Sequence, residues 1–263
     1  MEIYGYIASV LIGISLGLIG GGGSILTVPV LVYLFGVNAF TATEYSLLIV
    51  GISSLIGSVS YFKKGLVNLK TAFIFGIPSI ISIFITRNII LPLIPNEIFT
   101  LNHLVITKDI FLLLIFAGLM ILASYKMIQK NTKLQLENVH FKNKTVIAAA
   151  EGFSVGVLTG LVGAGGGFMI IPALVNLLKM PMKVAVGTSL VIISLNSLIG
   201  FLSSMDNAVI DWKLLTTISG IAIVGILIGS QLSRKIDGQR LKPAFGWFIL
   251  IMGIYIILKE IFF

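Results

Sequence analysis

The chain of 263 residues contains no cysteine, and this absence excludes disulfides, thiolate metal sites and any thiol relay. It contains only two histidines, His103 and His140, which stand singly in polar connectors and form no metal-binding group. Charged residues make up 11% of the chain, against about 25% in a typical soluble domain. The sequence therefore predicts neither a metal nor another cofactor, and its charge content is not that of a soluble protein.

Apolar residues make up 57% of the chain, and the mean hydropathy is +1.09. The start Met1-Glu2-Ile3-Tyr4 lacks the basic region of a cleaved signal peptide, so we expect the first apolar segment to remain in the mature protein. Stretches of about 20 apolar residues suit a hydrocarbon core of about 30 Å. They predict an all-α integral membrane protein and recur at 42–62, 71–91, 110–126, 184–204, 214–232 and 243–258.

The chain repeats itself at an offset of 143 residues. The stretch Gly17–Gly23 returns as Gly160–Gly166, and 17 of the 41 positions in 17–57 are identical to those in 160–200. Internal duplication in an apolar chain is typical of membrane transporters. We therefore predict two membrane repeats joined by a basic polar connector, with boundaries at 1–128, 129–144 and 145–263.

Each repeat begins with an apolar segment that is too long for one helix across the bilayer. The first, Ile3–Phe35, is interrupted at Gly20–Gly23 and then by Pro29. The second half repeats this pattern, with interruptions at Gly163–Gly167 and Pro172. Each glycine costs about 1 kcal/mol of helix propensity, and proline disfavours helical geometry at the residue before it. We therefore expect both segments to be broken.

Positive charge distinguishes two arrangements of these segments. If each broken segment crosses the bilayer, the protein has eight spans and parallel halves. If each is a re-entrant hairpin, it has six full spans and inverted halves. The first arrangement places 10 Lys and Arg residues on one side and 8 on the other, whereas the second places 14 against 4. Cytoplasmic loops are rich in these residues.

We therefore predict two inverted repeats, each with a re-entrant Gly-rich helical hairpin and three transmembrane helices. The connector 129–144 is then cytoplasmic and both termini lie outside. The net charge of +8 does not indicate a nucleic-acid partner, because the basic residues lie in short loops between spans, as topology determinants do.

The two glycine breaks are the candidate substrate site. Irregular backbone is costly in lipid unless it lines a cavity, so symmetry-related breaks near the midplane indicate a binding site. Inverted halves bring the two tips together, and free N–H groups there suit a small anion. The alternative is that the glycines serve only close helix packing. The candidates are Gly20, Gly21, Gly22, Gly23, Ser24, Gly163, Gly165, Gly166 and Gly167.

A polar stripe on the helix after each break offers further donors to an oxyanion. Positions seven residues apart share one helix face. The alternative is that these side chains bond their own backbone carbonyls or a neighbouring helix. In the first half the stripe is Ser46, Ser53 and Ser54, which match Ser189, Asn196 and Ser197 in the second, with Thr188 beside them.

Three ionisable residues stand out at membrane depth, where a charge is costly and indicates function. Glu44 has Gly187 as its repeat partner, and Glu151 lies opposite Ala8. Either carboxylate is a candidate carrier of a coupling proton; the alternative for Glu44 is that it reaches the headgroups. Arg87 is a candidate gate for the anion, and the alternative is that it snorkels to the outer interface.

The sequence resembles the sulfite exporter TauE/SafE family of membrane permeases. The resemblance rests on Gly160-Leu161-Val162-Gly163-Ala164-Gly165-Gly166-Gly167 with Pro172, followed by Ala185-Val186-Gly187-Thr188-Ser189-Leu190. The first half carries a looser copy, in which Glu44-Tyr45 replaces Gly187-Thr188. The resemblance implies a bacterial or archaeal inner-membrane protein that moves small sulfur-containing anions, such as sulfite, sulfonates or sulfoacetate, or other organic acids, with coupling to protons.

Together these features predict a secondary transporter that moves a small anion by alternating access. No nucleotide-binding motif is present, so an ion gradient would supply the energy, or the protein is a uniporter. An anion channel with an amide-lined pore is the alternative. A membrane enzyme has little support, since the sequence has no metal site and no Ser–His pair at membrane depth. The expected partners are the anion, protons and the bilayer, and the sequence assigns no oligomeric state.

Overall fold

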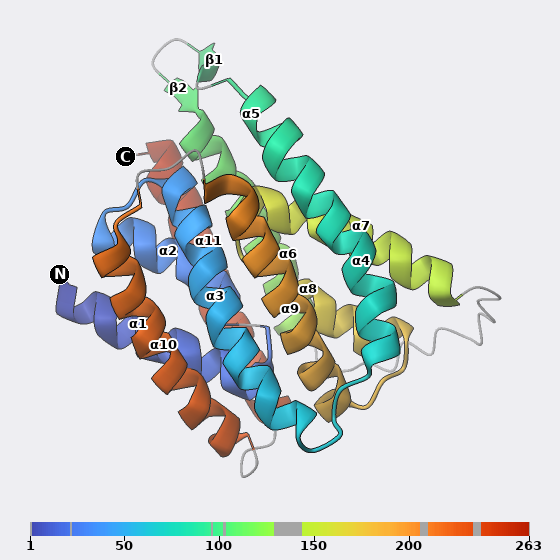
Figure 1. Ribbon diagram of the computed structural model, residues 1–263. Coiled ribbons are helices and arrows are strands. Elements are labelled where there is room, and N and C mark those ends of the chain that lie inside the picture. The colour runs from blue at the N-terminus through green and yellow to red at the C-terminus, as the bar shows by residue number, and fades with distance from the viewer. Residues whose placement is uncertain are drawn as a thin grey trace.

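The computed structural model describes residues 2–21, 23–95, 97–101, 104–128, 144–205, 210–233 and 238–262. Gly22, both histidines and residues 129–143 of the predicted connector lie outside the described residues. In chain order the elements are α1 (Glu2–Ile19), α2 (Ser24–Phe35), α3 (Ala39–Phe62), α4 (Leu69–Ile85), the π-helix η1 (Thr86–Ile90), α5 (Leu91–Leu93), β1 (Glu97–Leu101), β2 (Leu104–Thr107), α6 (Lys108–Ile128), α7 (Lys144–Val162), α8 (Gly167–Pro172), the π-helix η2 (Ala173–Leu177), α9 (Met182–Ser204), α10 (Trp212–Leu232) and α11 (Gly238–Phe262) (Figure 1).

Six of the described helices are long and apolar enough to cross a membrane. Five of them coincide with predicted stretches, namely α3, α4 with its continuation to Leu93, α6, α9 and α10. The sixth is α7, which we predicted as the first arm of a broken segment. The helix α11 covers the remaining predicted stretch, 243–258. The chain is thus a helical membrane protein with long apolar spans and several shorter helices.

A short β-hairpin between α5 and α6 departs from the all-helical prediction. The strands β1 and β2 pair antiparallel, with Leu101 opposite Leu104 and a register shift between Glu97 and Phe99. This segment follows Pro95 and is rich in β-branched and aromatic residues, which favour strands. The prediction missed it because the apolar stretches on either side dominate the pattern.

Matched side chains begin equivalent helices in the two halves. The Asn68 side chain accepts a hydrogen bond from the Thr71 amide at the start of α4, and Asp211 accepts one from the Leu214 amide at the start of α10. Asn68 and Asp211 are separated by the repeat offset of 143 residues. Such side chains satisfy a donor that the first turn of a helix leaves free. The duplication therefore extends beyond the glycine stretches to helix starts.

Glycines set the closest contacts between helices of different halves. The helix α1 packs along α10, and α7 packs along α4 (Figure 1). A Cβ atom on Gly13 of α1 would overlap the backbone of Ala222 and Gly225 on α10, and one on Gly156 of α7 would overlap Ser79 on α4. Small residues at these positions let the two backbones approach closely, which is how helices associate in lipid.

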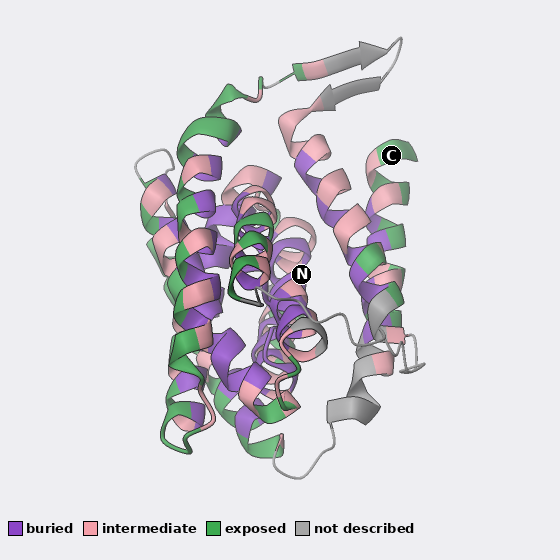
Figure 2. Cartoon of the chain, turned by 90° about the vertical axis from the view of Figure 1, so that its right-hand side faces the viewer, coloured by how far each residue is buried: buried purple, intermediate pink, exposed green. Residues whose placement is uncertain are grey.

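The helices α3 and α9 form the buried centre of the bundle and run antiparallel. Gly57 of α3 packs against Leu190 of α9, whereas Leu47 packs against Gly200. Residue numbers therefore rise along one helix as they fall along the other. Figure 2 shows the buried residues concentrated in the interior and the exposed ones on the outer helix faces. These two helices are the most buried of the long apolar spans.

The first broken segment folds back on itself as a helical hairpin. Gly23, just before α2, packs against Ile12 and Leu16 of α1. At the other end of the hairpin Phe35 packs edge-on against Tyr6, with the ring centroids 5.4 Å apart. The start of α2 therefore lies beside the later part of α1, and its end lies beside the beginning of α1.

The second broken segment also turns back at its glycines. Gly166 packs against Thr159 of α7. After η2, Leu178 lines a small cavity together with Thr145 and Ala148, close to the start of α7. The chain that follows the break therefore returns along α7 towards its beginning.

The prolines do not interrupt the helices in the way that we predicted. Pro29 lies inside α2, where the residue before it, Val28, is helical. A proline in a helix removes one backbone hydrogen bond, and the buried apolar surroundings of α2 outweigh that loss. Pro172 ends α8 and is followed at once by η2, whose wider turn accommodates the missing bond. The glycines alone break the two segments.

The last helix holds the far end of the first hairpin. The Tyr33 hydroxyl on α2 donates a 3.0 Å hydrogen bond to Glu260 Oε1 on α11, and Lys259 Nζ lies 4.0 Å from the centre of the Tyr33 ring. The Tyr255 ring packs edge-on against Tyr33 with a centroid distance of 5.7 Å. The chain thus ties residues from its two ends together.

We expect Gly13→Ala to destabilise the protein, because the new methyl group would collide with the α10 backbone and overpacking costs about 1–3 kcal/mol. The matched control is Gly220→Ala on α10, where a Cβ atom would meet open space. That change should leave stability equal or raise it by about 1 kcal/mol through helix propensity. Thermal unfolding of the purified protein in detergent measures both. Equal unfolding temperatures for the two variants would contradict the close α1–α10 packing.

Candidate functional site

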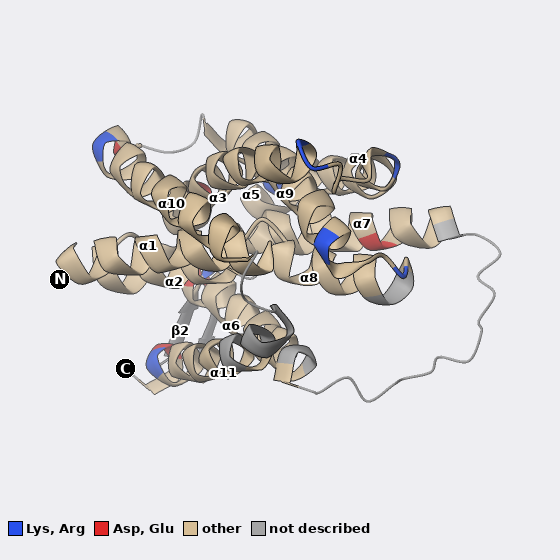
Figure 3. Ribbon diagram, turned by 90° about the horizontal axis from the view of Figure 1, so that it is seen from below, with Lys and Arg blue, Asp and Glu red and all other residues tan. Residues whose placement is uncertain are grey.

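The two glycine breaks meet in the interior of the bundle. Gly21 and Gly167 lie backbone against backbone, so closely that a Cβ atom on either would overlap the other. Seen from below, α1 and α7 enter the bundle from opposite sides and run towards its centre (Figure 3). Gly20 has φ +82° and Gly163 has φ +72°, in the left-handed region that favours glycine. The duplicated glycines therefore serve both a turn and a close backbone contact.

Each break also rests against the central helix of the other half. Gly20 of the first half contacts Val186 and lies beside the Ser189 hydroxyl, both on α9. Gly163 of the second half contacts Thr43 on α3. Thr43 and Val186 are separated by the repeat offset, so equivalent positions of the two central helices cover the two breaks. The irregular backbone is in this way shielded from lipid.

Only part of the predicted amide donors is free. The amides of Gly20 and Gly163 donate 2.8 Å hydrogen bonds to the carbonyls of Leu16 and Thr159. These two amides are engaged because a residue that leaves a helix still completes the last turn with its own N–H. The predicted amides for which the described residues provide no acceptor are those of Gly21, Gly23, Ser24, Gly165, Gly166 and Gly167.

Several hydroxyls of the polar stripe are buried without a partner. Ser46 and Ser53 on α3 form no hydrogen bond with any described residue. Ser58 on the same helix differs, because its hydroxyl donates to the backbone carbonyl of Leu55 one turn earlier. Buried polar groups in proteins are nearly always paired, so each exception requires an explanation. The own-backbone alternative therefore fails for Ser46 and Ser53. Their hydroxyls are available to a bound ligand or to water.

Asn196 extends this free polar surface onto α9. Its Nδ2 donates a 2.7 Å hydrogen bond to Ser79 Oγ, but its Oδ1 has no partner among the described residues. The hydroxyls of Ser54 and Ser197, which match each other in the repeat, are also buried and unpaired. Ser197 Oγ lies beside Gly165, so the free hydroxyls reach the second break.

Two predicted hydroxyl donors are already engaged. Ser189 Oγ donates to the Val186 carbonyl at 2.8 Å, and Ser24 Oγ donates to the Gly21 carbonyl at 2.7 Å. For the Ser189 hydroxyl the structural alternative, bonding to its own backbone, is therefore the observed one. Thr188 Oγ1 instead accepts a 3.0 Å hydrogen bond from the Asn68 amide, so its O–H can still donate.

Sequence reasoning missed two buried hydroxyls near the breaks. Thr27 on α2 and Thr159 on α7 have no hydrogen-bond partner among the described residues, and Thr159 Oγ1 lies beside Gly166. Their repeat partners, Ile170 and Leu16, are apolar, so the comparison of the two halves carried no signal for them. A search for hydroxyls within one helical turn of the breaks would have found both.

Glu44 and Arg87 come together in the interior. Each is only 2% exposed, so the headgroup and snorkelling alternatives were wrong. Arg87 Nη2 donates to Thr43 Oγ1 at 3.1 Å, and Nη1 lies 3.5 Å from Ser204 Oγ. The Glu44 carboxylate lies within electrostatic range of Arg87 and Lys108, yet neither of its oxygens has a hydrogen-bond partner among the described residues. Two opposite charges therefore share one buried place next to the second break.

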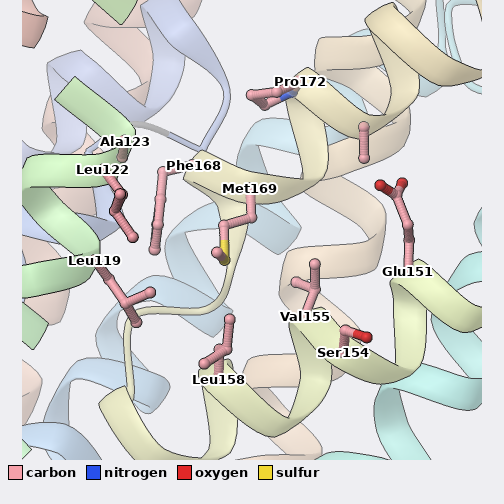
Figure 4. Close-up of a pocket in the computed structure, with 11 residues that line it drawn as sticks. Leu119, Leu122, Ala123, Glu151, Ser154, Val155, Leu158, Phe168, Met169 and Pro172 are labelled. Carbon is pink, nitrogen blue, oxygen red and sulfur yellow. The ribbon is translucent and has the colours of Figure 1, made fainter. Parts of the chain in front are cut away.

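Glu151 lies apart from this group. It precedes Gly163 by twelve residues, or about 18 Å along α7. It lines a cavity of about 440 Å³ between α6, α7 and α8, and the lining is otherwise apolar except for Ser154 (Figure 4). The structure thus separates the two carboxylates that the sequence offered as proton carriers.

Comparison with known proteins identifies the family. The sequence profile described as "Sulfite exporter TauE/SafE" matches residues 6–256. The chain belongs to the TauE/SafE family. No solved structure matches the chain.

Curated proteins similar to this TauE/SafE chain include bacterial and archaeal ones. A "Probable membrane transporter protein" of Xylella fastidiosa (strain 9a5c) is 29% identical over 258 residues, which cover 95% of this chain and 92% of that protein. "Probable membrane transporter protein YunE" of Bacillus subtilis is 29% identical over 264 residues, 93% of each chain. "Probable membrane transporter protein MJ0441" of Methanocaldococcus jannaschii is 37% identical over 110 residues, 40% of this chain and 41% of that protein. This TauE/SafE protein is therefore a multi-pass membrane transporter and not an enzyme.

Single cysteines can test whether the unpaired hydroxyls line a hydrated site, because the chain has no cysteine of its own. We expect Ser53→Cys to react with a water-soluble methanethiosulfonate reagent, since unpaired buried hydroxyls require water when no ligand is bound. Leu55→Cys, on the exposed face of the same helix, should not react, because lipid excludes both the reagent and the thiolate. Labelling followed by mass spectrometry measures both. An unreactive Ser53→Cys beside a reactive Leu55→Cys would contradict the site.

Proposed function

We propose that this TauE/SafE protein is a secondary transporter that moves a small sulfur-containing anion, such as sulfite or a sulfonate, across a bacterial or archaeal cell membrane by alternating access. The observation that carries the proposal is the meeting of two unwound glycine breaks beside buried hydroxyls that lack partners. The family description, which names sulfite, supports the choice of sulfur.

A small oxyanion fits the chemistry of this place. The unpaired groups at the breaks are main-chain amides together with serine and threonine hydroxyls, all of which donate hydrogen bonds. Sulfite and sulfonate groups present three oxygens that accept such bonds from several directions.

We further propose that the two halves are inverted repeats. Shifting the Gly13–Ala222 contact of α1 and α10 by the repeat offset gives Gly156 on α7 and Ser79 on α4, and these two residues are in contact. The same offset relates α3 to α9, which run antiparallel. Equivalent helices that run in opposite directions are expected of inverted halves and not of parallel ones.

We propose that most of the bundle forms two bodies that move against each other. One body contains α1, α2, α3 and α10, and the other contains α4, α7, α8 and α9; within each, the helices are in contact. Each body takes helices from both halves, and α3 and α9 form the interface between them. We propose that rocking about the α3–α9 interface exposes the glycine breaks first to one side of the membrane and then to the other. The paired helices α6 and α11 stand beside both bodies.

For orientation we propose that the connector 129–144 is cytoplasmic and that both termini lie outside. The excess of lysine and arginine on the connector side supports this choice, because such residues are retained in the cytoplasm. With this orientation the β-hairpin formed by β1 and β2 lies on the outer side, at the end of α4 and the start of α6.

Cross-linking can test the inverted arrangement. Four positions suffice: Leu47 and Gly57 on α3, and Leu190 and Gly200 on α9. We expect the cysteine pairs 47–200 and 57–190 to form disulfides under mild oxidation, because these residues pack together in antiparallel helices. The matched controls, pairs 47–190 and 57–200, use the same four substitutions and should remain unlinked. If only the control pairs cross-link, the central helices are parallel and the inverted arrangement is wrong.

Anion flux tests the proposed site. We expect Ser53→Ala to weaken the uptake of sulfite or methanesulfonate into liposomes about tenfold in apparent affinity, because one hydrogen bond to a charged ligand is lost. The matched control is Ser58→Ala on the same helix, whose hydroxyl bonds its own backbone and should be dispensable. Purified protein in liposomes and protein-free liposomes are compared. Absence of uptake of both anions by the unmodified protein would refute the proposed function, and equal affinities in the two variants would refute the site.

A further inference from the structure

The charged residues beside the site occur in only one half of the duplication. Glu44 corresponds to Gly187 in the repeat, and Arg87 corresponds to Ser230. The two halves therefore supply similar backbone and hydroxyl groups to the breaks, but among the residues that the structure describes only the first half supplies a buried acid and a buried base. Two charges retained at 2% exposure require a reason, because burying them without full pairing is expensive.

The guanidinium of Arg87 is only partly satisfied. Its two terminal nitrogens contact the hydroxyls of Thr43 and Ser204, and its Nε has no partner among the described residues. Arg87 lies in the π-helix η1, a local widening of the helix that frequently marks functional sites. A buried cation that binds only neutral hydroxyls still lacks a negative partner in direct contact.

The carboxylate of Glu44 is the negative group placed to supply that charge. It is faced by Arg87 from η1, by Lys108 from α6 and by the Ser204 hydroxyl from α9. Both of its oxygens are buried without a hydrogen bond to a described residue. The acid and the base are thus close enough to neutralise each other electrostatically, but they do not form a closed ion pair.

The other charged and titratable groups that the structure describes around Glu44 have hydrogen-bond partners of their own. Lys108 Nζ donates a 2.6 Å hydrogen bond to the Leu91 carbonyl and lies over the ring of Phe40. Asp109 on α6 accepts a 3.0 Å hydrogen bond from the Phe40 amide. The Tyr45 hydroxyl accepts a 2.6 Å hydrogen bond from the Asp211 amide. Glu44 and Arg87 are therefore the groups free to change partners.

Thr43 connects this pair to the proposed anion site. It binds Arg87 through its hydroxyl, and its backbone and side chain meet Gly163 at the second break. One turn earlier on α7, Gly160 packs against Thr86, the neighbour of Arg87. An anion at the second break would therefore lie within reach of the guanidinium.

We propose that Glu44 and the transported anion neutralise Arg87 in turn, so that one proton accompanies each anion. With Glu44 ionised, its carboxylate balances Arg87 and the anion is excluded. When a proton binds a carboxylate oxygen of Glu44, that negative charge disappears and the anion replaces it. Release of the anion on the other side leaves Arg87 without a counter-charge, so Glu44 gives up its proton there. This inference rests on the proposed function and adds how the transport of the anion is coupled to protons.

The test uses full-length protein in liposomes with radiolabelled methanesulfonate as the probe. A sulfonate does not titrate near neutral pH, so protons that move with it are carried by the protein. We expect the unmodified protein to accumulate the label when the outside is acidified. Glu44→Gln should still exchange outside label for inside methanesulfonate but should lose the acid-driven accumulation. Arg87→Gln should lose both activities, because the guanidinium no longer attracts the anion.

Glu151→Gln is the matched control, since Glu151 is the other carboxylate at membrane depth and lies away from Arg87. It should keep both exchange and acid-driven accumulation. Acid-driven accumulation by Glu44→Gln at the level of the unmodified protein would overturn the proposal, as would its loss in Glu151→Gln alone. Loss of exchange in Glu44→Gln would also count against it, provided that the variant elutes as a single folded species.

A measurement on the unmodified protein covers the case in which the variants do not fold. The affinity of the protein for methanesulfonate can be measured from the rise in unfolding temperature that the ligand causes. Over the pH range in which Glu44 takes up its proton, this affinity should increase up to about tenfold for each unit by which the pH falls. An affinity independent of pH would overturn the proposal. Flux that does not depend on pH would likewise refute the proton coupling but not the proposal that the protein transports an anion. Absence of any flux would refute the proposed function itself.

Discussion

Backbone that leaves a helix at membrane depth cannot form hydrogen bonds with lipid, so its amides and carbonyls must be shielded from lipid by protein. The arrangement of the bundle follows from this constraint. Gly21 and Gly167 bring the two irregular stretches into contact, and α3 and α9 cover them from either side. The glycines of α1 and α7 let these helices press against α10 and α4, which closes the bundle around the breaks.

Sequence identity and local structure recur at the offset of 143 residues, but several polar side chains do not. Matched side chains begin α4 and α10, and glycines at matched positions of α1 and α7 pack against α10 and α4. Ser53 corresponds to an amide, Asn196, and the charged residues Glu44 and Arg87 correspond to the neutral Gly187 and Ser230. The two halves of the sequence therefore share the positions that hold helices together and differ in the polar groups beside the glycine breaks.

The parts of the fold that sequence predicted are those with local signals. Runs of apolar residues predicted the long helices, and the duplicated glycines predicted both breaks, because glycine runs interrupt a helix whatever surrounds them. The burial of Arg87 was not predictable, because a residue near a helix end is expected at the membrane–water interface. Only the fold shows that Thr43 and Ser204 lie beside its guanidinium. The engagement of Ser189 and the freedom of Ser53 likewise depend on local geometry that residue types do not reveal.

The hydrogen bond between Tyr33 and Glu260 joins residues 227 positions apart. During synthesis, α2 leaves the ribosome long before its partner α11 exists, and α1 must likewise wait for α10. The first hairpin therefore acquires its full set of helix neighbours only after most of the intervening chain has been made.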